Sequence, residues 1–170
     1  FIRNFNQLSD NHYIVSPEGL HRFYLNGFNG RVGASWMTKE ERLTDISDYV
    51  MYLDELYKTI LAQINHKVVI NVLGFSQGGA TASRWVCQGA SKVDNLILWA
   101  TVFPPDLNFS EDVKKLNNIN IQLVIGDQDE FISSKDIDEH EQLLKEAKIN
   151  YQLNLFSGEH KIYHEVLQKI

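Results

Sequence analysis

The chain has 170 residues and a formal net charge of −6 at pH 7, and 44% of its residues are hydrophobic. Because this length is typical of one domain, we expect residues 1–170 to be a single domain with its own core. The acidic balance argues against nucleic acid and anionic membranes as partners, and no apolar run is long enough for membrane insertion. The one cysteine, Cys87, excludes a disulfide framework and a cysteine zinc site. It fits a reducing compartment, so the expected location is cytoplasmic.

The first part of the sequence predicts a short strand, an irregular segment and a long helix. Residues 13–15 form the apolar strand, and residues 18–37 are polar with interspersed glycines and aromatic residues, without a regular period. Thr38 and Glu41 have the spacing of a helix capping box. The helix that follows has apolar residues at the helical period, namely Ile46, Tyr49, Val50, Leu53, Leu56, Tyr57, Ile60 and Ile64.

Strands and helices alternate through the rest of the chain. The strands are predicted at residues 67–73, 96–99, 121–125 and 151–156. Helices are predicted after Ser76 to about Gly89, over residues 135–148 and over residues 161–170. This alternation is typical of an α/β fold with three layers (α/β/α) and a mainly parallel sheet. Functional side chains should then lie beyond the carboxyl ends of the strands.

The segment Gly74-Phe75-Ser76-Gln77-Gly78 joins a predicted strand to a predicted helix. This is the G-x-S-x-G nucleophile elbow, a sharp turn with a serine at its tip. The glycines at positions 74 and 78 are expected where a side chain would collide with the helix backbone. Ser76 should adopt a strained conformation that exposes Oγ above the helix N-terminus, where partial positive charge favours an oxyanion.

A serine nucleophile needs a base, and the base needs an acid that orients it. The loop after strand 121–125 contains Asp127 and Asp129, and the loop after strand 151–156 contains His160. We favour His160 over His164, which lies inside the last predicted helix. Asp127 is nearer the strand end and could instead accept hydrogen bonds from loop amides, whereas Asp129 has more reach. The spacing alone does not separate the two aspartates.

Three segments together resemble one family. Gly74–Ala80, Gly126–Ile132 and Gly158-Glu159-His160 are similar to the carboxylesterase/phospholipase branch of the α/β-hydrolases, which includes acyl-protein thioesterases and small bacterial esterases. The resemblance implies the α/β-hydrolase fold and a triad of Ser76, His160 and Asp129. It also implies the backbone N–H of Gln77 as first oxyanion donor, with no cofactor and no metal.

The activity that this resemblance implies is hydrolysis of carboxylic esters or thioesters through an acyl-enzyme. The absence of a long apolar lid segment favours a small soluble substrate. Four aromatic residues are candidates for its pocket, although at least half of such residues are expected to be core or loop-packing side chains: Trp36, Phe75, Trp99 and Phe103.

One departure from the family concerns the oxyanion hole. Family members have an early strand that ends in a His-Gly loop, which supplies the second oxyanion donor. No His-Gly pair occurs here, and residues 11–17 resemble the segment that follows that strand. We therefore expect the first strands of the fold, and the second donor with them, to be missing from residues 1–170.

Two other functions stay open. One is another α/β-hydrolase chemistry, of the peptidase or dienelactone-hydrolase type, which would use the same three side chains. The other is a catalytically silent binding module with the same fold. The intact Ser76, Asp129 and His160 argue against the silent module, whereas the missing His-Gly loop is compatible with it. The sequence does not indicate the oligomeric state.

Overall fold

The computed structural model describes residues 1–8 and 10–170. They form two compact units, one of residues 1–49 and 162–170 and the other of residues 50–161. The expectation of a single domain over residues 1–170 stays a prediction. Every residue proposed for the triad lies in the second unit.

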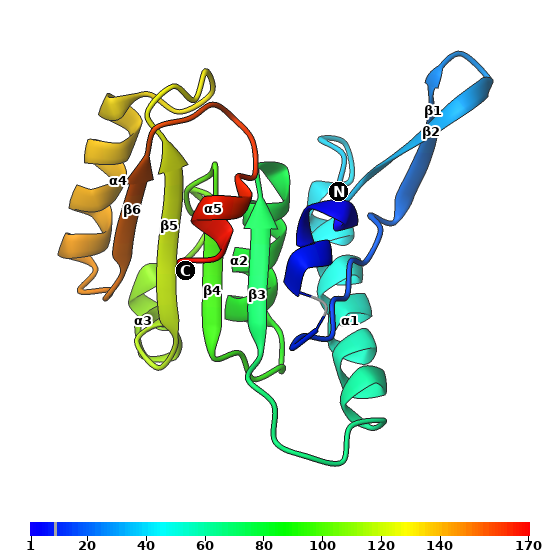
Figure 1. Cartoon of the computed structure of the whole chain (residues 1–170), viewed down its shortest axis with the longest axis horizontal. Coiled ribbons are helices and arrows are strands. Elements are labelled where there is room, and N and C mark those ends of the chain that lie inside the picture. The colour runs from blue at the N-terminus through cyan, green and yellow to red at the C-terminus, as the bar shows by residue number, and fades with distance from the viewer. Residues whose placement is uncertain (9) are drawn as a thin grey trace. The chain divides into compact units, whose positions relative to one another are not determined.

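The second unit contains a parallel sheet with the strand order β3-β4-β5-β6 (Figure 1). The four strands are β3 (Asn71–Phe75), β4 (Asn95–Trp99), β5 (Asn120–Gly126) and β6 (Gln152–Phe156). Successive strands are connected through α2 (Gln77–Gln88), α3 (Phe109–Leu116) and α4 (Ser134–Glu146). The strands run in one direction, so all four carboxyl ends lie at the same edge of the sheet. The predicted α/β class, with a parallel sheet flanked by helices, is confirmed.

The two central strands are buried along nearly their whole length. Leu96 and Leu98 of β4 are 0% exposed and belong to one aliphatic cluster with Leu123 of β5 and with residues of the connecting helices. The intervening residues Ile97 and Trp99 are also buried, at 8% and 0% exposure. Burial of both faces is characteristic of a parallel sheet and explains why these strands are continuous apolar runs in the sequence.

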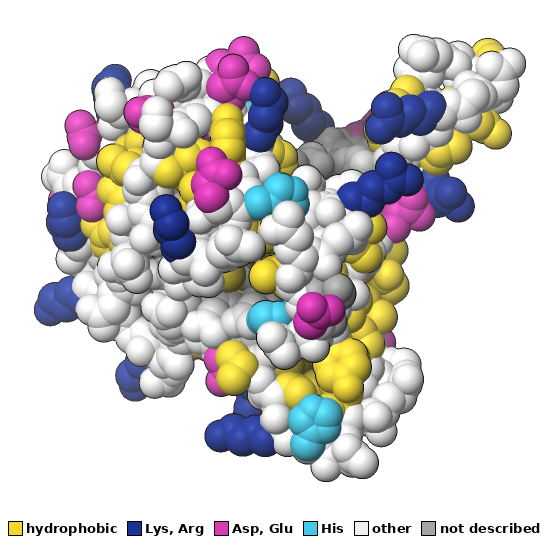
Figure 2. All heavy atoms as spheres, in the orientation of Figure 1, with side chains coloured by type: hydrophobic (Ala, Val, Ile, Leu, Met, Phe, Trp, Pro, Cys, Tyr) yellow, Lys and Arg dark blue, Asp and Glu magenta, His cyan; other side chains and the backbone are white. Residues whose placement is uncertain are grey.

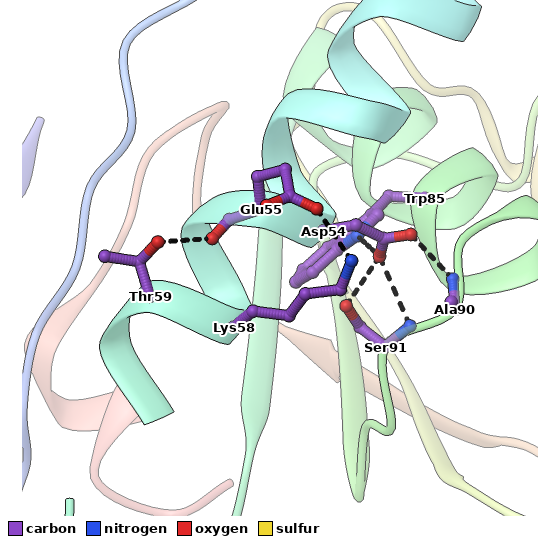
Figure 3. A network of polar contacts seen from close by, with 7 residues as sticks. All are labelled: Asp54, Glu55, Lys58, Thr59, Trp85, Ala90 and Ser91. Atoms are coloured by element: carbon purple, nitrogen blue, oxygen red, sulfur yellow. Dashed lines mark hydrogen bonds and ion pairs between the residues drawn. The ribbon is translucent and has the colours of Figure 1, made fainter. Parts of the chain in front are cut away.

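Asp54 joins α1 (Arg42–Leu61) to the end of α2 (Figure 3). Its carboxylate accepts hydrogen bonds from the Trp85 indole N–H at 2.9 Å, the Ala90 N–H at 2.8 Å and the Ser91 hydroxyl at 2.6 Å. Burial acts to raise the pKa of Asp54, but the hydrogen bonds from Ala90, Ser91 and Trp85 outweigh it and lower the pKa overall. A half-buried carboxylate with this many donors is a strong anchor. It fixes the turn after α2 and therefore the helix that follows Ser76.

The first unit contains a β-hairpin where the sequence predicted an irregular segment. β1 (His21–Asn26) and β2 (Asn29–Ser35) pair antiparallel, so the prediction for residues 18–37 was wrong. Gly27, in the turn between the strands, has a φ of 64°, a conformation that favours glycine, and Gly30 near the start of β2 has a φ of 86°. The strand expected at residues 13–15 is not formed. The unit also contains the 3₁₀-helix η1 (Ile2–Leu8) and the single-turn helix α5 (His164–Leu167).

The long helix begins close to its predicted cap. The Thr38 hydroxyl accepts a hydrogen bond from the Glu41 N–H at 3.3 Å, as the capping box requires. In a capping box the side chain of Glu41 would accept the Thr38 N–H, but here the Asp45 carboxylate accepts it at 2.6 Å. Helix α1 starts at Arg42, about one turn later than a cap at Thr38 implies. No helix in the described part of the chain is long and apolar enough to cross a membrane.

Two other differences from the predicted elements are local. Helix α3 was not predicted, because it has only eight residues and its apolar positions Phe109, Val113 and Leu116 are separated by charged residues. The last predicted helix, over residues 161–170, is reduced to the four residues of α5.

Candidate active site

Ser76 lies in the turn between β3 and α2 in a strained conformation. Its φ is 53° and its ψ is −125°, a combination that a non-glycine residue adopts at an energetic cost. Two backbone hydrogen bonds hold it there, from the Ser76 N–H to the Trp99 carbonyl at 3.0 Å and from the Gly79 N–H to the Ser76 carbonyl at 2.9 Å. The strained elbow expected from the sequence is confirmed.

The elbow depends on glycine at positions 74 and 79. A Cβ on Gly74 would lie 2.4 Å from the Gly79 Cα, and a Cβ on Gly79 would lie 2.1 Å from the Thr101 Cγ2. The prediction for Gly74 is therefore confirmed. The prediction for Gly78 was wrong, because a Cβ there has no atom within 4 Å apart from its chain neighbours and the nearby backbone of its own helix. The helix backbone approaches β3 one residue later than the motif alone suggests.

The structure joins Asp129 to His160. The Nδ1 of His160 lies 2.8 Å from the Oδ2 of Asp129, and the Phe131 N–H donates to Oδ1 of the same carboxylate at 2.9 Å. The Asp129 side chain is 0% exposed, and the His160 side chain is 16% exposed. With Nδ1 facing the carboxylate, the Nε2 of the imidazole faces away from it and is available to a reacting group.

The His160 ring contacts two phenylalanine rings. The ring centroids lie 4.9 Å from that of Phe75 and 4.7 Å from that of Phe131. Phe75 is the last residue of β3 and directly precedes Ser76. The loop after β6 therefore carries His160 across the carboxyl ends of β5 and β4 to the elbow, which brings two of the three predicted triad positions close together.

Trp99 connects the elbow to the histidine loop. Its carbonyl accepts the Ser76 N–H, and its indole N–H donates to the Lys161 carbonyl at 2.9 Å. The side chain is 0% exposed and lies in the core. The expectation that Trp99 lines a substrate pocket stays a prediction. The sequence does not show that Trp99 links these two segments. The one available signal is general: a buried indole N–H normally needs a hydrogen-bond acceptor.

Asp127 holds the acid loop against the histidine loop. Its carboxylate accepts the Gly158 N–H at 3.0 Å, and its own N–H donates to the Phe156 carbonyl at 2.9 Å. A Cβ on Gly126 would lie 2.2 Å from the Gly158 carbonyl oxygen, so the two loops approach each other closely. Of the two aspartates, Asp129 contacts the imidazole and Asp127 binds backbone, which matches the alternative left open for Asp127.

Phe103 lies in the hydrophobic core, and its expected place in a substrate pocket stays a prediction. It is 3% exposed, stacks on His140 with a centroid distance of 5.9 Å, and packs edge-on against Phe109. Its N–H donates to the His140 Nε2 at 3.2 Å. Burial lowers the pKa of His140 to about 4, so near pH 7 the imidazole is neutral and can accept this hydrogen bond. Trp36 lies in the first unit, where it packs edge-on against Tyr49.

The expected oxyanion donor is the first residue of α2. The N–H of Gln77 is one of the donors that have no partner within the helix itself, at the end where the helix dipole is positive. The second donor stays unassigned. Among residues 1–8 and 10–170, no group of three or more His, Cys, Asp or Glu side chains is arranged to hold a metal ion.

Comparisons of the sequence point to one family. The model of the family described as phospholipase/carboxylesterase matches residues 3–170, which is nearly the whole chain. A search of the curated proteins found no match to this chain.

Solved structures share the fold. An uncharacterised protein from Bacillus cereus ATCC 10987 is similar with a TM-score of 0.72 and 21% identity, over 98% of this chain and 51% of that protein. The chain therefore spans about half the length of that relative. SOBER1 from Arabidopsis thaliana is similar with a TM-score of 0.63 and 18% identity, over 82% of this chain and 72% of SOBER1. A carboxylesterase from Bacillus cereus has a TM-score of 0.64 and 16% identity, over 89% of this chain and 69% of that enzyme.

Proposed function

Because the chain belongs to the phospholipase/carboxylesterase family of α/β-hydrolases, we propose that it is a serine hydrolase that cleaves carboxylic esters through an acyl-enzyme on Ser76. The observation that carries the proposal is the 2.8 Å contact between His160 and the buried Asp129. The same imidazole packs against Phe75, next to the strained serine. A buried carboxylate, an oriented imidazole and a half-buried serine at a helix N-terminus are the parts that acyl transfer requires.

In the first step, the Nε2 of His160 accepts the proton of Ser76 as Oγ attacks the carbonyl carbon of the ester. Asp129 keeps the other imidazole proton on Nδ1 and stabilises the imidazolium that forms. Because the carboxylate is inaccessible to water, this charge interaction is stronger than it would be at the surface. The contacts with Phe75 and Phe131 restrict the imidazole to this orientation.

The N–H of Gln77 donates a hydrogen bond to the carbonyl oxygen and stabilises the negative charge that develops on it. The imidazolium then donates its proton to the leaving alcohol, and the acyl group stays on Ser76. In the second step, His160 removes a proton from water as the water oxygen attacks the acyl carbonyl. The imidazolium then returns a proton to the Ser76 Oγ as its bond to the acyl carbon breaks and the acid is released. A thiolate leaves more readily than an alkoxide, so thioesters are included in the proposed substrate class.

The proposed substrate is a small soluble ester, and the proposed location is the cytoplasm, where the thiol of Cys87 stays reduced. Burial is the largest of the influences that raise the pKa of this thiol to about 12, so Cys87 is not a competing nucleophile. Neither a cofactor nor nucleic acid has a part in the proposed reaction.

The function is tested with p-nitrophenyl esters of increasing acyl length, assayed beside a peptide p-nitroanilide and a dienelactone. We expect turnover of the short-chain esters, with kcat/KM falling as the acyl chain lengthens. Turnover of the anilide or the lactone without ester turnover would show that the chain is not an esterase and catalyses another α/β-hydrolase reaction. Absence of turnover on all substrates would favour the silent binding module.

A further inference from the structure

Phe131 is an exposed aromatic residue that contacts the imidazole of the proposed triad. It is 69% exposed, although it lies two residues after Asp129, whose side chain is 0% exposed. Its ring meets the His160 ring edge-on, with the ring centroids 4.7 Å apart and the ring planes at 66°. Phe75, the other phenylalanine on this imidazole, is half-buried at the end of β3. Of the two rings, Phe131 therefore offers more surface to a bound molecule.

The loop that carries Phe131 is held at three points. At its start, the Asp127 carboxylate accepts the Gly158 N–H at 3.0 Å. In its middle, the Phe131 N–H donates to Oδ1 of Asp129 at 2.9 Å. At its end, the Ser133 capping box fixes the first turn of α4. Because the backbone on both sides of Phe131 is anchored, the binding of a molecule to its ring requires little ordering of the loop.

The reaction proposed above separates the two parts of an ester in space. The carbonyl carbon bonds to Ser76 Oγ, and the carbonyl oxygen lies against the Gln77 N–H. The leaving oxygen or sulfur must come within about 3 Å of the His160 Nε2, because that nitrogen donates the proton with which it departs. The substituent on the leaving atom therefore lies next to the imidazole and the aromatic rings that contact it.

The charges around Phe131 are mainly negative. Residues 126–134 contain Asp127, Asp129 and Glu130 but no Lys, Arg or His. Two lysines nearby in the chain are each paired with a glutamate: Lys135 with Glu139 and Lys161 with Glu159. Figure 2 shows acidic and hydrophobic side chains on the surface where the loops after β5 and β6 lie. Such a surface repels a leaving group that carries phosphate or carboxylate and accepts an uncharged one.

We propose that Phe131 is a specificity-determining residue that binds the leaving group of the ester or thioester, and that this leaving group is uncharged and apolar, with aromatic groups favoured. The proposal rests on the proposed esterase function and adds the class of alcohol or thiol that the site accepts. An aromatic leaving group packs on the Phe131 ring, edge-on or offset-stacked, while its oxygen or sulfur takes the proton of the imidazolium. Glu130, which precedes Phe131 in the chain and is exposed, disfavours anionic leaving groups.

The test compares acetate esters that differ only in the alcohol. Benzyl acetate and methyl acetate have leaving groups of similar basicity, so the ratio of their kcat/KM values reports binding of the phenyl ring rather than intrinsic reactivity. We expect the wild type to prefer benzyl acetate and Phe131→Ser to lower this ratio about tenfold. Phe131→Leu, which keeps an apolar side chain, should lower it less, and Phe131→Tyr, which keeps the ring, should preserve it.

Val69→Ser is the matched control variant. Val69 is 64% exposed and precedes β3, at the opposite end of the strands from the triad, so its replacement should leave the ratio unchanged. Methyl butanoate and methyl acetate form the control pair of substrates, because they differ only in the acyl part. Their ratio should be the same in the wild type and in Phe131→Ser. Circular dichroism establishes that each variant is folded.

The charge preference is tested with 4-carboxybenzyl acetate beside benzyl acetate. We expect the wild type to hydrolyse the anionic ester more slowly, and Glu130→Gln to reduce this difference by a few-fold at low salt. Equal turnover of the two esters by the wild type would contradict the proposed selection against charge.

The proposal is overturned if Phe131→Ser lowers kcat/KM equally for benzyl acetate and methyl acetate, since Phe131 would then act only by positioning His160. It is also overturned if the substitution changes the ratio of the two methyl esters instead, which would assign Phe131 to the acyl chain. Absence of turnover of every ester by the wild type is a different result. It would refute the esterase function itself, and the proposal with it.

Discussion

Ser76→Ala is expected to lower kcat for p-nitrophenyl ester hydrolysis by about four to six orders of magnitude. The variant loses the Oγ nucleophile while His160, Asp129 and the Gln77 N–H remain in place. Its fold should be unchanged, because alanine and serine are similar in size and are strained alike at a φ of 53°. Steady-state kinetics measures the loss of turnover, and thermal unfolding followed by circular dichroism measures the stability of the variant.

Ser83→Ala is the matched control for the serine substitution. Ser83 lies in the same helix, is 0% exposed, and its hydroxyl has no hydrogen-bond partner among the described residues. Its replacement therefore removes no interaction and should leave kcat within a few-fold of the wild type. Full ester turnover in Ser76→Ala, with Ser83→Ala unchanged, would exclude Ser76 as the nucleophile.

Asp129→Asn should reduce kcat by about 10⁴-fold, whereas Asp127→Asn should change it by less than about tenfold. An asparagine at position 129 no longer enforces a proton on the Nδ1 of His160 and leaves the imidazolium without a charged partner. An asparagine at position 127 can still accept the Gly158 N–H through its amide oxygen. Its expected effect is a small loss of stability, of about 1 kcal/mol.

The two aspartate variants differ by two positions in one loop and make the same chemical change, so each is the control for the other. Kinetics on a short-chain p-nitrophenyl ester, together with melting temperatures, distinguishes loss of the reaction from loss of the fold. A collapse of kcat in Asp127→Asn with near-normal turnover in Asp129→Asn would assign the acid to Asp127. Equal small effects of both substitutions on kcat would show that neither carboxylate takes part in the reaction.

The sheet and the position of its functional edge could be predicted from the sequence, because the signals are local. The buried strands β4 and β5 are continuous apolar runs, and the elbow, the acid loop and the histidine loop each directly follow a strand. The contact partner of His160 could not be predicted in this way. Asp127 and Asp129 are close in the chain, and only the path of the loop decides which carboxylate reaches the imidazole.

Other features depend on contacts between distant segments. The double link of Trp99 to Ser76 and Lys161 requires three segments to meet, so the sequence shows only a buried aromatic residue. The hairpin was missed for another reason. A strand with one buried face alternates apolar and polar residues, but Phe23-Tyr24-Leu25 is apolar on both faces and has no such period. The close approach at Gly79 likewise depends on Thr101 of a different loop.

The most direct test of the central claim is covalent labelling with a p-nitrophenyl phosphonate, which reacts with an activated serine and cannot be hydrolysed like an acyl-enzyme. Intact mass and peptide mapping would show how many adducts form and on which residue. The account predicts one adduct, on Ser76, absent in Ser76→Ala and formed much more slowly in Asp129→Asn than in Asp127→Asn. No adduct on the wild type, or an adduct on another residue, would contradict the account.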